Sequence, residues 1–392
     1  MSENSPARLP NVLLDAVTFG FRFDLTPFSS DAMDAFRGNL GHLLTKGTDR
    51  HRLVLEVPIG RLGELGFAKV ELVPALSTPG RFGSMSNVSF NGMRLLRRHL
   101  HGQGFTNLSL DNSDNFIGPI VRPVEQLLHA QLDLMALALA TVARALDEAV
   151  PAGCDTGAVE TWLKSAEACL DLEVQDAKEA VRRLQRTGLP GRTRYCVDWY
   201  RASATDSAGA ITVRYWRQQH GPCFKVYAKD HQLLRVEIDC ANRAAFRALK
   251  CTQKDGHVDG TTARKLLLEF AELAEPLLND LRTHVLEAAD ATASVDELLL
   301  ALSPLLDLRR GIGAPTGRII KVDTASAASE AIESLFTSGA VEATGWRHGH
   351  ALRRILDELS NPSGPLVHSS RRAIFCLRPS YARAAESVAE MT

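Results

Sequence analysis

Alternation of apolar and charged residues in the middle of the chain constrains the fold more than any other feature. In 169–174, 223–229 and 233–239 every second residue is apolar, and the residues between are mostly acidic, basic or tyrosine. Successive side chains of a β-strand point to opposite faces of a sheet. Residues such as Leu170 and Leu172 therefore share a face that we expect to pack against helices. The opposite face is predicted to be strongly ionic.

The remaining periodicities predict an α+β protein. Residues 124–150 repeat apolar side chains at steps of four and three and stop at Pro151, which indicates one long helix. Over 168–250 we expect the order β-α-β-β-β-β-α, with an antiparallel meander at its end. The fold class is a central antiparallel-rich sheet covered by helices. Strands are also predicted at 12–23, 51–57, 67–73 and 195–200, a basic helix after an Asn-Gly turn at 91–92, and a second helix at 157–168.

The C-terminal part is predicted to be helical and similar to a winged helix. Helices are expected at 262–288 with a kink at Pro276, and at 294–310, 325–338 and 348–360, before two short strands around a polar turn in 366–377. Three domains follow from this division. They are an N-terminal α+β region at 1–120, a helical hairpin plus the central sheet at 121–255, and a winged-helix-like DNA-binding domain at 256–392.

Composition excludes several classes of protein. The 392 residues carry a formal net charge of −1, which does not favour a globally basic nucleic-acid binder. We find no run of about 18 apolar residues and no signal peptide, so we expect a soluble, cytoplasmic protein without a membrane partner. The seven cysteines are an odd number without a C-x-x-C pair, which argues against a disulfide framework or a thiolate zinc site.

The ionic face of the predicted sheet has the residue types of a phosphodiester-cleaving site. Clustered carboxylates repel one another unless a cation such as Mg²⁺ or Mn²⁺ binds them, and Asp171, Glu173 and Glu237 are the candidate ligands. Tyr227 or Tyr215 could then attack a phosphodiester polarised by the metal. The alternative is an ordinary antiparallel sheet whose basic residues pair with its acids across strands.

The residues 215–230 and 234–238, read as Tyr-Trp-Arg-Gln-Gln-His-Gly-Pro-Cys-Phe-Lys-Val-Tyr-Ala-Lys-Asp and Leu-Arg-Val-Glu-Ile, resemble a signature of plasmid and phage rolling-circle replication initiators. The resemblance covers about 165–250. It implies a nicking enzyme that binds its origin and joins a tyrosine to the 5′ phosphate with the help of a metal. It also implies Asp171 and Glu237 as the acidic positions, Tyr227 and Lys229 as the Tyr-x-Lys element, and Tyr215 as the upstream tyrosine, which we prefer narrowly as nucleophile.

Departures from that signature leave open whether the protein cleaves DNA or only binds it. Ala228 replaces the usual Asp, Trp216 follows the upstream tyrosine instead of Gly, and a His-hydrophobic-His motif is missing beside the central sheet. The alternative is a non-catalytic DNA-binding regulator or assembly factor; a third is an interaction protein that uses its helical segments. The basic C-terminal end could bind duplex DNA or serve dimerisation. The candidate DNA-binding residues are Arg94, Arg97, Arg98, Lys225, Arg235, Arg347, Arg353, Arg354, Arg371 and Arg372.

Overall fold

The computed structural model confirms an α+β protein with a large antiparallel sheet. It divides into two compact units, Met1–Leu170 with Ile238–Leu277 (unit 1) and Asp171–Glu237 with Leu278–Thr392 (unit 2). Both units are discontinuous in sequence, whereas the sequence suggested three consecutive segments. The structure describes residues 11–391 except 47, 50, 76–79, 84, 106–123, 157–159, 187–211, 217–220, 230, 254–259, 291–292, 311–321, 344–348, 362–363 and 370–373.

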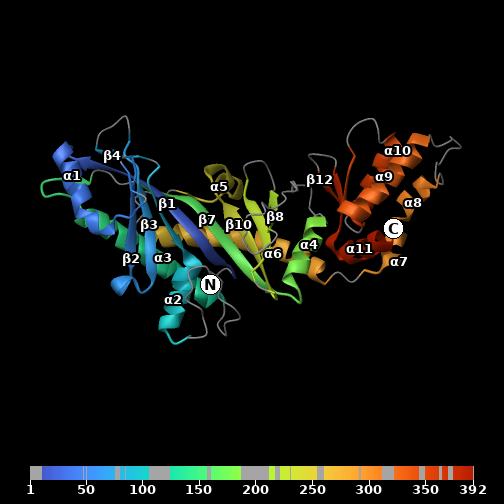
Figure 1. Cartoon of the computed structure of the whole chain (residues 1–392), viewed down its shortest axis with the longest axis horizontal. Coiled ribbons are helices and arrows are strands. Elements are labelled where there is room, and N and C mark those ends of the chain that lie inside the picture. The colour runs from blue at the N-terminus through green and yellow to red at the C-terminus, as the bar shows by residue number, and fades with distance from the viewer. Residues whose placement is uncertain are drawn as a thin grey trace, which may run out of the picture. The chain divides into compact units, whose positions relative to one another are not determined.

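Unit 1 is built on a sheet with the strand order β2-β3-β5-β1-β7. The long strand β1 lies between β5 and β7 and is antiparallel to both. Helices α2 and α3 contact this sheet at β1, β3 and β5 (Figure 1). The elements are β1 (Leu13–Thr26), α1 (Ser30–Asn39), β2 (Leu53–Ile59), β3 (Gly66–Leu72), β4 (Arg81–Phe82), β5 (Asn87–Asn91), α2 (Gly92–Gly102), α3 (Val124–Glu148), β6 (Asp155–Thr156), β7 (Glu160–Glu173), α5 (Arg243–Leu249), α6 (Gly260–Ala289) and the 3-10 turns Gly41–Leu43 and Arg61–Gly63. The last residues of β7 and α6 belong to unit 2.

The helix predicted at 157–168 is wrong, because most of this segment belongs to strand β7. Its Ala, Glu and Lys content favours a helix, but pairing with β1 along most of its length overrides that propensity. The indole of Trp162 lies over Gly20 of β1, where a Cβ would stand 2.5 Å from the ring. Glycine at position 20 therefore leaves room for the Trp162 ring to lie over β1.

Helix α3 is the one described helix whose length and composition would allow it to cross a membrane, over Gln126–Glu148. Half of that stretch is buried inside the protein. The buried side chains include Leu128, Leu132 and Met135, which recur with the helical period that the sequence showed. A helix packed in this way is weak evidence for a membrane span.

Unit 2 combines the strand order β10-β9-β8 with a separate C-terminal core. Helix α4 packs on β8 and β9 through Ala180, Val181 and Leu184, which are buried. The C-terminal helices surround a small sheet with the antiparallel order β11-β13-β12. The elements are α4 (Ala177–Arg186), β8 (Thr212–Trp216), β9 (Cys223–Ala228), β10 (Leu233–Cys240), α7 (Val295–Ala301), α8 (Ser303–Arg309), α9 (Val322–Ser338), β11 (Ala340–Glu342), α10 (Gly349–Leu359), β12 (Leu366–Ser369), β13 (Ile374–Leu377), the 3-10 turn Pro379–Tyr381 and α11 (Ala382–Met391).

One helix prediction changes in detail. The single helix expected at 294–310 is two helices, because Pro304 begins a new one at the first turn of α8. Helix α6 contains Pro276, as the sequence predicted. The strand predicted at 195–200 lies outside the described residues.

Candidate nucleic-acid interface

Helix α2 carries the first basic patch, and three polar side chains fix where it begins. Asn91 ends β5 and caps the helix, since its side chain accepts a hydrogen bond from the Arg94 backbone N–H (2.8 Å). The same Asn91 donates its amide to the buried carboxylate of Asp15 (2.8 Å). Glycine follows at position 92 because a Cβ there would lie 2.7 Å from the carbonyl oxygen of Leu14.

Gln131 of α3 completes this support. Its side-chain oxygen accepts from the Leu14 N–H (2.7 Å), and its amide nitrogen donates to the Leu14 carbonyl (2.6 Å). Leu14 lies two residues before Ala16, the first β1 residue paired with β5. A fully buried side-chain amide thus takes the place of a strand partner beyond the end of β5, so that the buried backbone groups remain satisfied.

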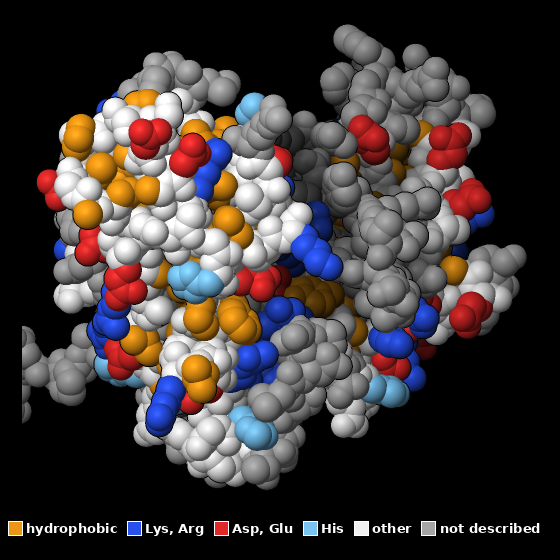
Figure 2. Space-filling view, turned by 60° about the vertical axis from the view of Figure 1, so that its left-hand side comes forward, with side chains coloured by type: hydrophobic (Ala, Val, Ile, Leu, Met, Phe, Trp, Pro, Cys, Tyr) orange, Lys and Arg blue, Asp and Glu red, His pale blue; other side chains and the backbone are white. Residues whose placement is uncertain are grey.

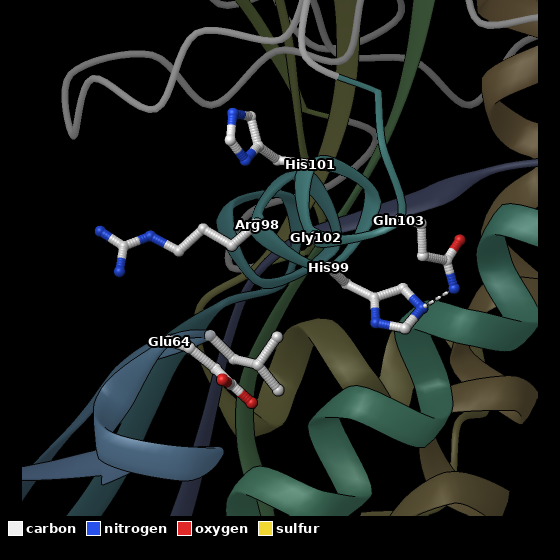
Figure 3. A pocket seen from close by; sticks show the side chains of 7 residues that line it. Glu64, Arg98, His99, His101, Gly102 and Gln103 are labelled. Carbon is white, nitrogen blue, oxygen red and sulfur yellow. Dashed lines mark hydrogen bonds between the residues drawn. The ribbon is translucent and has the colours of Figure 1, made fainter.

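The outer side of α2 borders an open groove in unit 1, which we call the α2 groove. Two adjoining cavities of about 560 and 400 Å³ form it and share Leu65 and Arg98. Figure 3 shows Arg98 and His101 extending from α2 in different directions, while His99 turns toward Gln103. The residues that matter for charge and stacking are Phe67, Lys69, Arg94, Arg98, His99 and His101.

The charge of the α2 groove is mixed, and its arginines come from the helix. Arg94 and Arg98 line it together with Glu56, Glu64 and Lys69, and Lys69 is paired with Glu71 at 3.0 Å. Figure 2 likewise shows acidic, basic and hydrophobic side chains interspersed on the face that it displays. The groove is therefore suited to a few phosphate contacts rather than to a long anionic strand.

Of the three arginines predicted on α2, the structure brings two to the surface. Arg94 is exposed and Arg98 is half-buried, whereas the Arg97 side chain is 3% exposed and lies inside unit 1. Residues 94 and 98 are four apart and share a helical face, and residue 97 faces inward. As placed, Arg97 cannot reach a phosphate.

The predicted ionic face of the central sheet exists, and its charges are paired with one another. Arg235 is fully buried and donates from Nε and Nη2 to the two carboxylate oxygens of Asp171, at 2.6 and 2.8 Å. Glu237 is buried and accepts a hydrogen bond from the hydroxyl of Tyr227. Its carboxylate also lies 4.0 Å from both Arg235 Nη1 and Lys225 Nζ.

This arrangement does not fit the metal site that the sequence suggested. The bidentate guanidinium occupies the Asp171 oxygens that a Mg²⁺ or Mn²⁺ ion would need, and Glu173 is exposed. Among the described residues, no three His, Cys, Asp or Glu side chains are grouped so that they could hold a metal ion. The cross-strand ion pairs are those of the alternative interpretation. Burial also removes Arg235 from contact with DNA.

The structure describes the side chain of Tyr227 but only the backbone of Tyr215. Tyr227 has its hydroxyl engaged with Glu237, and the ammonium of Lys229 lies 4.9 Å from the centre of its ring. This hydrogen bond links strand β9 to strand β10. The backbone of Tyr215 pairs with Phe224 across β8 and β9, but its side chain lies outside the described residues.

The C-terminal basic residues are partly described. Arg353 of α10 bonds Asp357, approaches His368 Nε2 (3.1 Å) and lies over the ring of Phe375. Burial and the neighbouring guanidinium lower the pKa of His368, which favours its neutral, acceptor form. Exposed Arg354 pairs with Glu358 at 3.4 Å. Arg347, Arg371 and Arg372 lie outside the described residues.

Sequence reasoning missed the part of the α2 groove that comes from β3 and the turn before it. Phe67 and Lys69 were included in a predicted strand, and both are exposed. Their signal was available, because an exposed aromatic residue two positions from a lysine interrupts the expected apolar and polar alternation. No protein-family model, curated protein or solved structure matches this chain.

Proposed function

We propose that this chain is a DNA-binding protein of replication-initiator type that contacts DNA through the α2 groove. The observation that carries the proposal is the exposed face of α2, where Arg94 and Arg98 lie beside the open cavities. Cations on a rigid helix can neutralise phosphates, and such contacts position a protein on a duplex or a single strand. The anchoring of α2 through Asn91 and Gln131 gives that face a fixed orientation.

The alternative without catalysis is the one that the geometry favours. Nicking by the predicted route needs carboxylates that are free to bind a metal, and Asp171 and Glu237 are instead paired with Arg235, Lys225 and Tyr227. We therefore propose a binding or assembly factor, with the central ionic cluster as a structural element.

A second DNA contact is proposed in unit 2. The order β11-β13-β12 beside α9 and α10 is compatible with a winged helix, in which a helix enters a groove and a hairpin contacts the backbone. The exposed Arg354 of α10 would serve this contact. Because its pair with Glu358 is solvent-exposed, a phosphate could replace the carboxylate at little cost.

Fluorescence anisotropy with a labelled oligonucleotide, single-stranded or annealed, tests the proposal. The double substitution Arg94→Ala and Arg98→Ala should weaken binding about 10-fold or more and lower the salt slope by about one for each phosphate that the variant no longer neutralises. Arg144→Ala, which removes an exposed arginine from α3 of the same unit, is the matched control. Equal affinity of the double variant and the control would reject the α2 groove as the binding surface.

A denaturing gel separates binding from catalysis. We expect no covalent protein–DNA band after incubation of the protein with single-stranded DNA and Mg²⁺ or Mn²⁺. A band that disappears in Tyr215→Phe or Tyr227→Phe would establish the nicking enzyme instead and name its nucleophile.

A further inference from the structure

The turn between β2 and β3 displays a leucine in an unfavourable backbone conformation. Leu62 has φ 57° and ψ 25°, in the left-handed region that side chains with a Cβ rarely adopt. Positive φ values also occur at Gly60, Gly63 and Gly66 in the same turn, where glycine is the expected residue. Leucine at position 62 is thus an outlier in its own turn.

Packing does not explain this leucine. Its side chain is 96% exposed, more than that of any other large hydrophobic residue on the described surface. A buried leucine could offset backbone strain through the hydrophobic effect, but this one stays in water. Backbone strain that packing does not compensate is concentrated at functional sites in proteins.

Leu62 itself does not line the α2 groove, but the residues that follow it in the turn, from Glu64 to Phe67, do. The ring of Phe67, itself 55% exposed, lies against Gly63, where a Cβ would be 3.2 Å from the ring carbon Cζ. The guanidinium of Arg98 lies over Gly66, with Nη1 3.7 Å from the position of a Cβ there. Glu64 of this turn and Arg98 of α2 line the same cavity (Figure 3). An apolar tip, an exposed aromatic ring and an arginine therefore follow one another along one surface.

We infer that Leu62 is a wedge that enters the base stack of DNA held in the α2 groove and that Phe67 stacks on a base opened in this way. The inference rests on the proposed function and names its substrate class, a single-stranded or locally opened DNA segment. Apolar side chains inserted between base steps unstack them, and aromatic side chains bind unpaired bases by stacking. Arg98 would hold the adjacent phosphate, because it lines the same cavity as Phe67.

A duplex that contains 2-aminopurine reports unstacking directly, since the fluorescence of this base rises when it leaves the stack. We expect the unaltered protein to raise the fluorescence and Leu62→Gly to abolish most of the rise. Anisotropy with the same duplex should change less than about 3-fold, because the phosphate contacts remain. Leu300→Ala, which shortens an exposed leucine of unit 2, is the control and should keep the full rise.

The glycine variant also excludes misfolding as an explanation. Glycine adopts the left-handed conformation without strain, so Leu62→Gly should melt at the same temperature as the unaltered protein or higher. Phe67→Ala should weaken binding to single strands about 5- to 150-fold, the range for removal of one stacked base, while Phe67→Leu tests whether an apolar side chain alone suffices.

The outcomes separate the wedge from DNA binding itself. Binding by anisotropy with no fluorescence rise, or a full rise with Leu62→Gly, overturns the wedge and leaves the proposed function in place; the exposed leucine would then serve a protein partner. Absence of binding to any oligonucleotide overturns both.

Discussion

Replacing Arg235 with methionine should lower the free energy of unfolding by about 3 kcal/mol. The guanidinium is fully buried and makes two short hydrogen bonds to Asp171, with a second carboxylate, Glu237, 4.0 Å away. Removing one partner of a buried ion pair costs about 3–5 kcal/mol, because the remaining charge stays in a poorly hydrated site. The Asp171 side chain is 20% exposed and can regain some water, which places the expected value at the lower end.

Urea unfolding followed by tryptophan fluorescence measures this destabilisation. Arg354→Met is the matched control, because it removes an exposed arginine–carboxylate pair of the same unit and should cost less than about 0.5 kcal/mol. Adding Asp171→Asn to Arg235→Met should recover about 1–2 kcal/mol, since the stranded negative charge disappears.

The same experiment decides between a structural and a metal-binding role for the carboxylates. A methionine variant as stable as the unaltered protein would refute the reasoning. So would a clear stabilisation of the unaltered protein by millimolar Mg²⁺, since a ligand that binds only the folded state raises its stability.

Three further predictions concern unit 1. The hydrogen bond from Arg81 holds the pKa of Asp24 below its usual 3.8, and a depressed carboxyl pKa contributes stability that is lost as the pH falls through the folded-state value. Asp24→Asn should therefore remove part of the stability lost on acidification below about pH 4, under about 1 kcal/mol because the pair is partly exposed, as urea midpoints at pH 7 and pH 3 would show. Burial raises the pKa of the Cys251 thiol to about 12, so it should react with Ellman's reagent at neutral pH only after unfolding, and rapid reaction in the folded protein would contradict this. Gln131→Leu leaves both backbone groups of Leu14 without these bonds and should cost about 2–4 kcal/mol in urea unfolding; a cost below about 1 kcal/mol would show that Leu14 finds other partners.

The sequence predicted the fold well where the spacing of apolar residues matches the burial of those residues. Strands β9 and β10 lie within two residues of their predicted ends, and their apolar members, such as Phe224, Val226 and Ile238, are fully buried. The error at β7 arose where composition and environment disagree. Alanine and glutamate favour a helix locally, and pairing with the long strand β1 decides the outcome.

In the candidate site, the sequence predicted which residues share a face but not which side chains pair with one another. The period of two placed Asp171 and Glu237 on one face, but it could not say that Arg235 would stand between them with its guanidinium near both. A like-charge cluster and a compensated ion-pair network have the same alternation, and only distances distinguish them. On α2, a helical period would have turned Arg97 inward, because it lies four residues after Met93 and three before Leu100, both of which are buried.

No pattern of residue types predicts the backbone conformation and the exposure of Leu62. The spacing of Gly60, Gly63 and Gly66 indicates a turn with positive φ values, yet nothing in it predicts that the leucine among them adopts such a value too. A leucine in a strand-rich segment is ordinarily assigned to a core, and this one is almost fully exposed. Strain and exposure are properties of the folded backbone. A basic patch on its own is ordinarily explained as a solvated surface. A strained, exposed leucine near the arginines of α2 is what makes us expect that this surface holds and opens DNA.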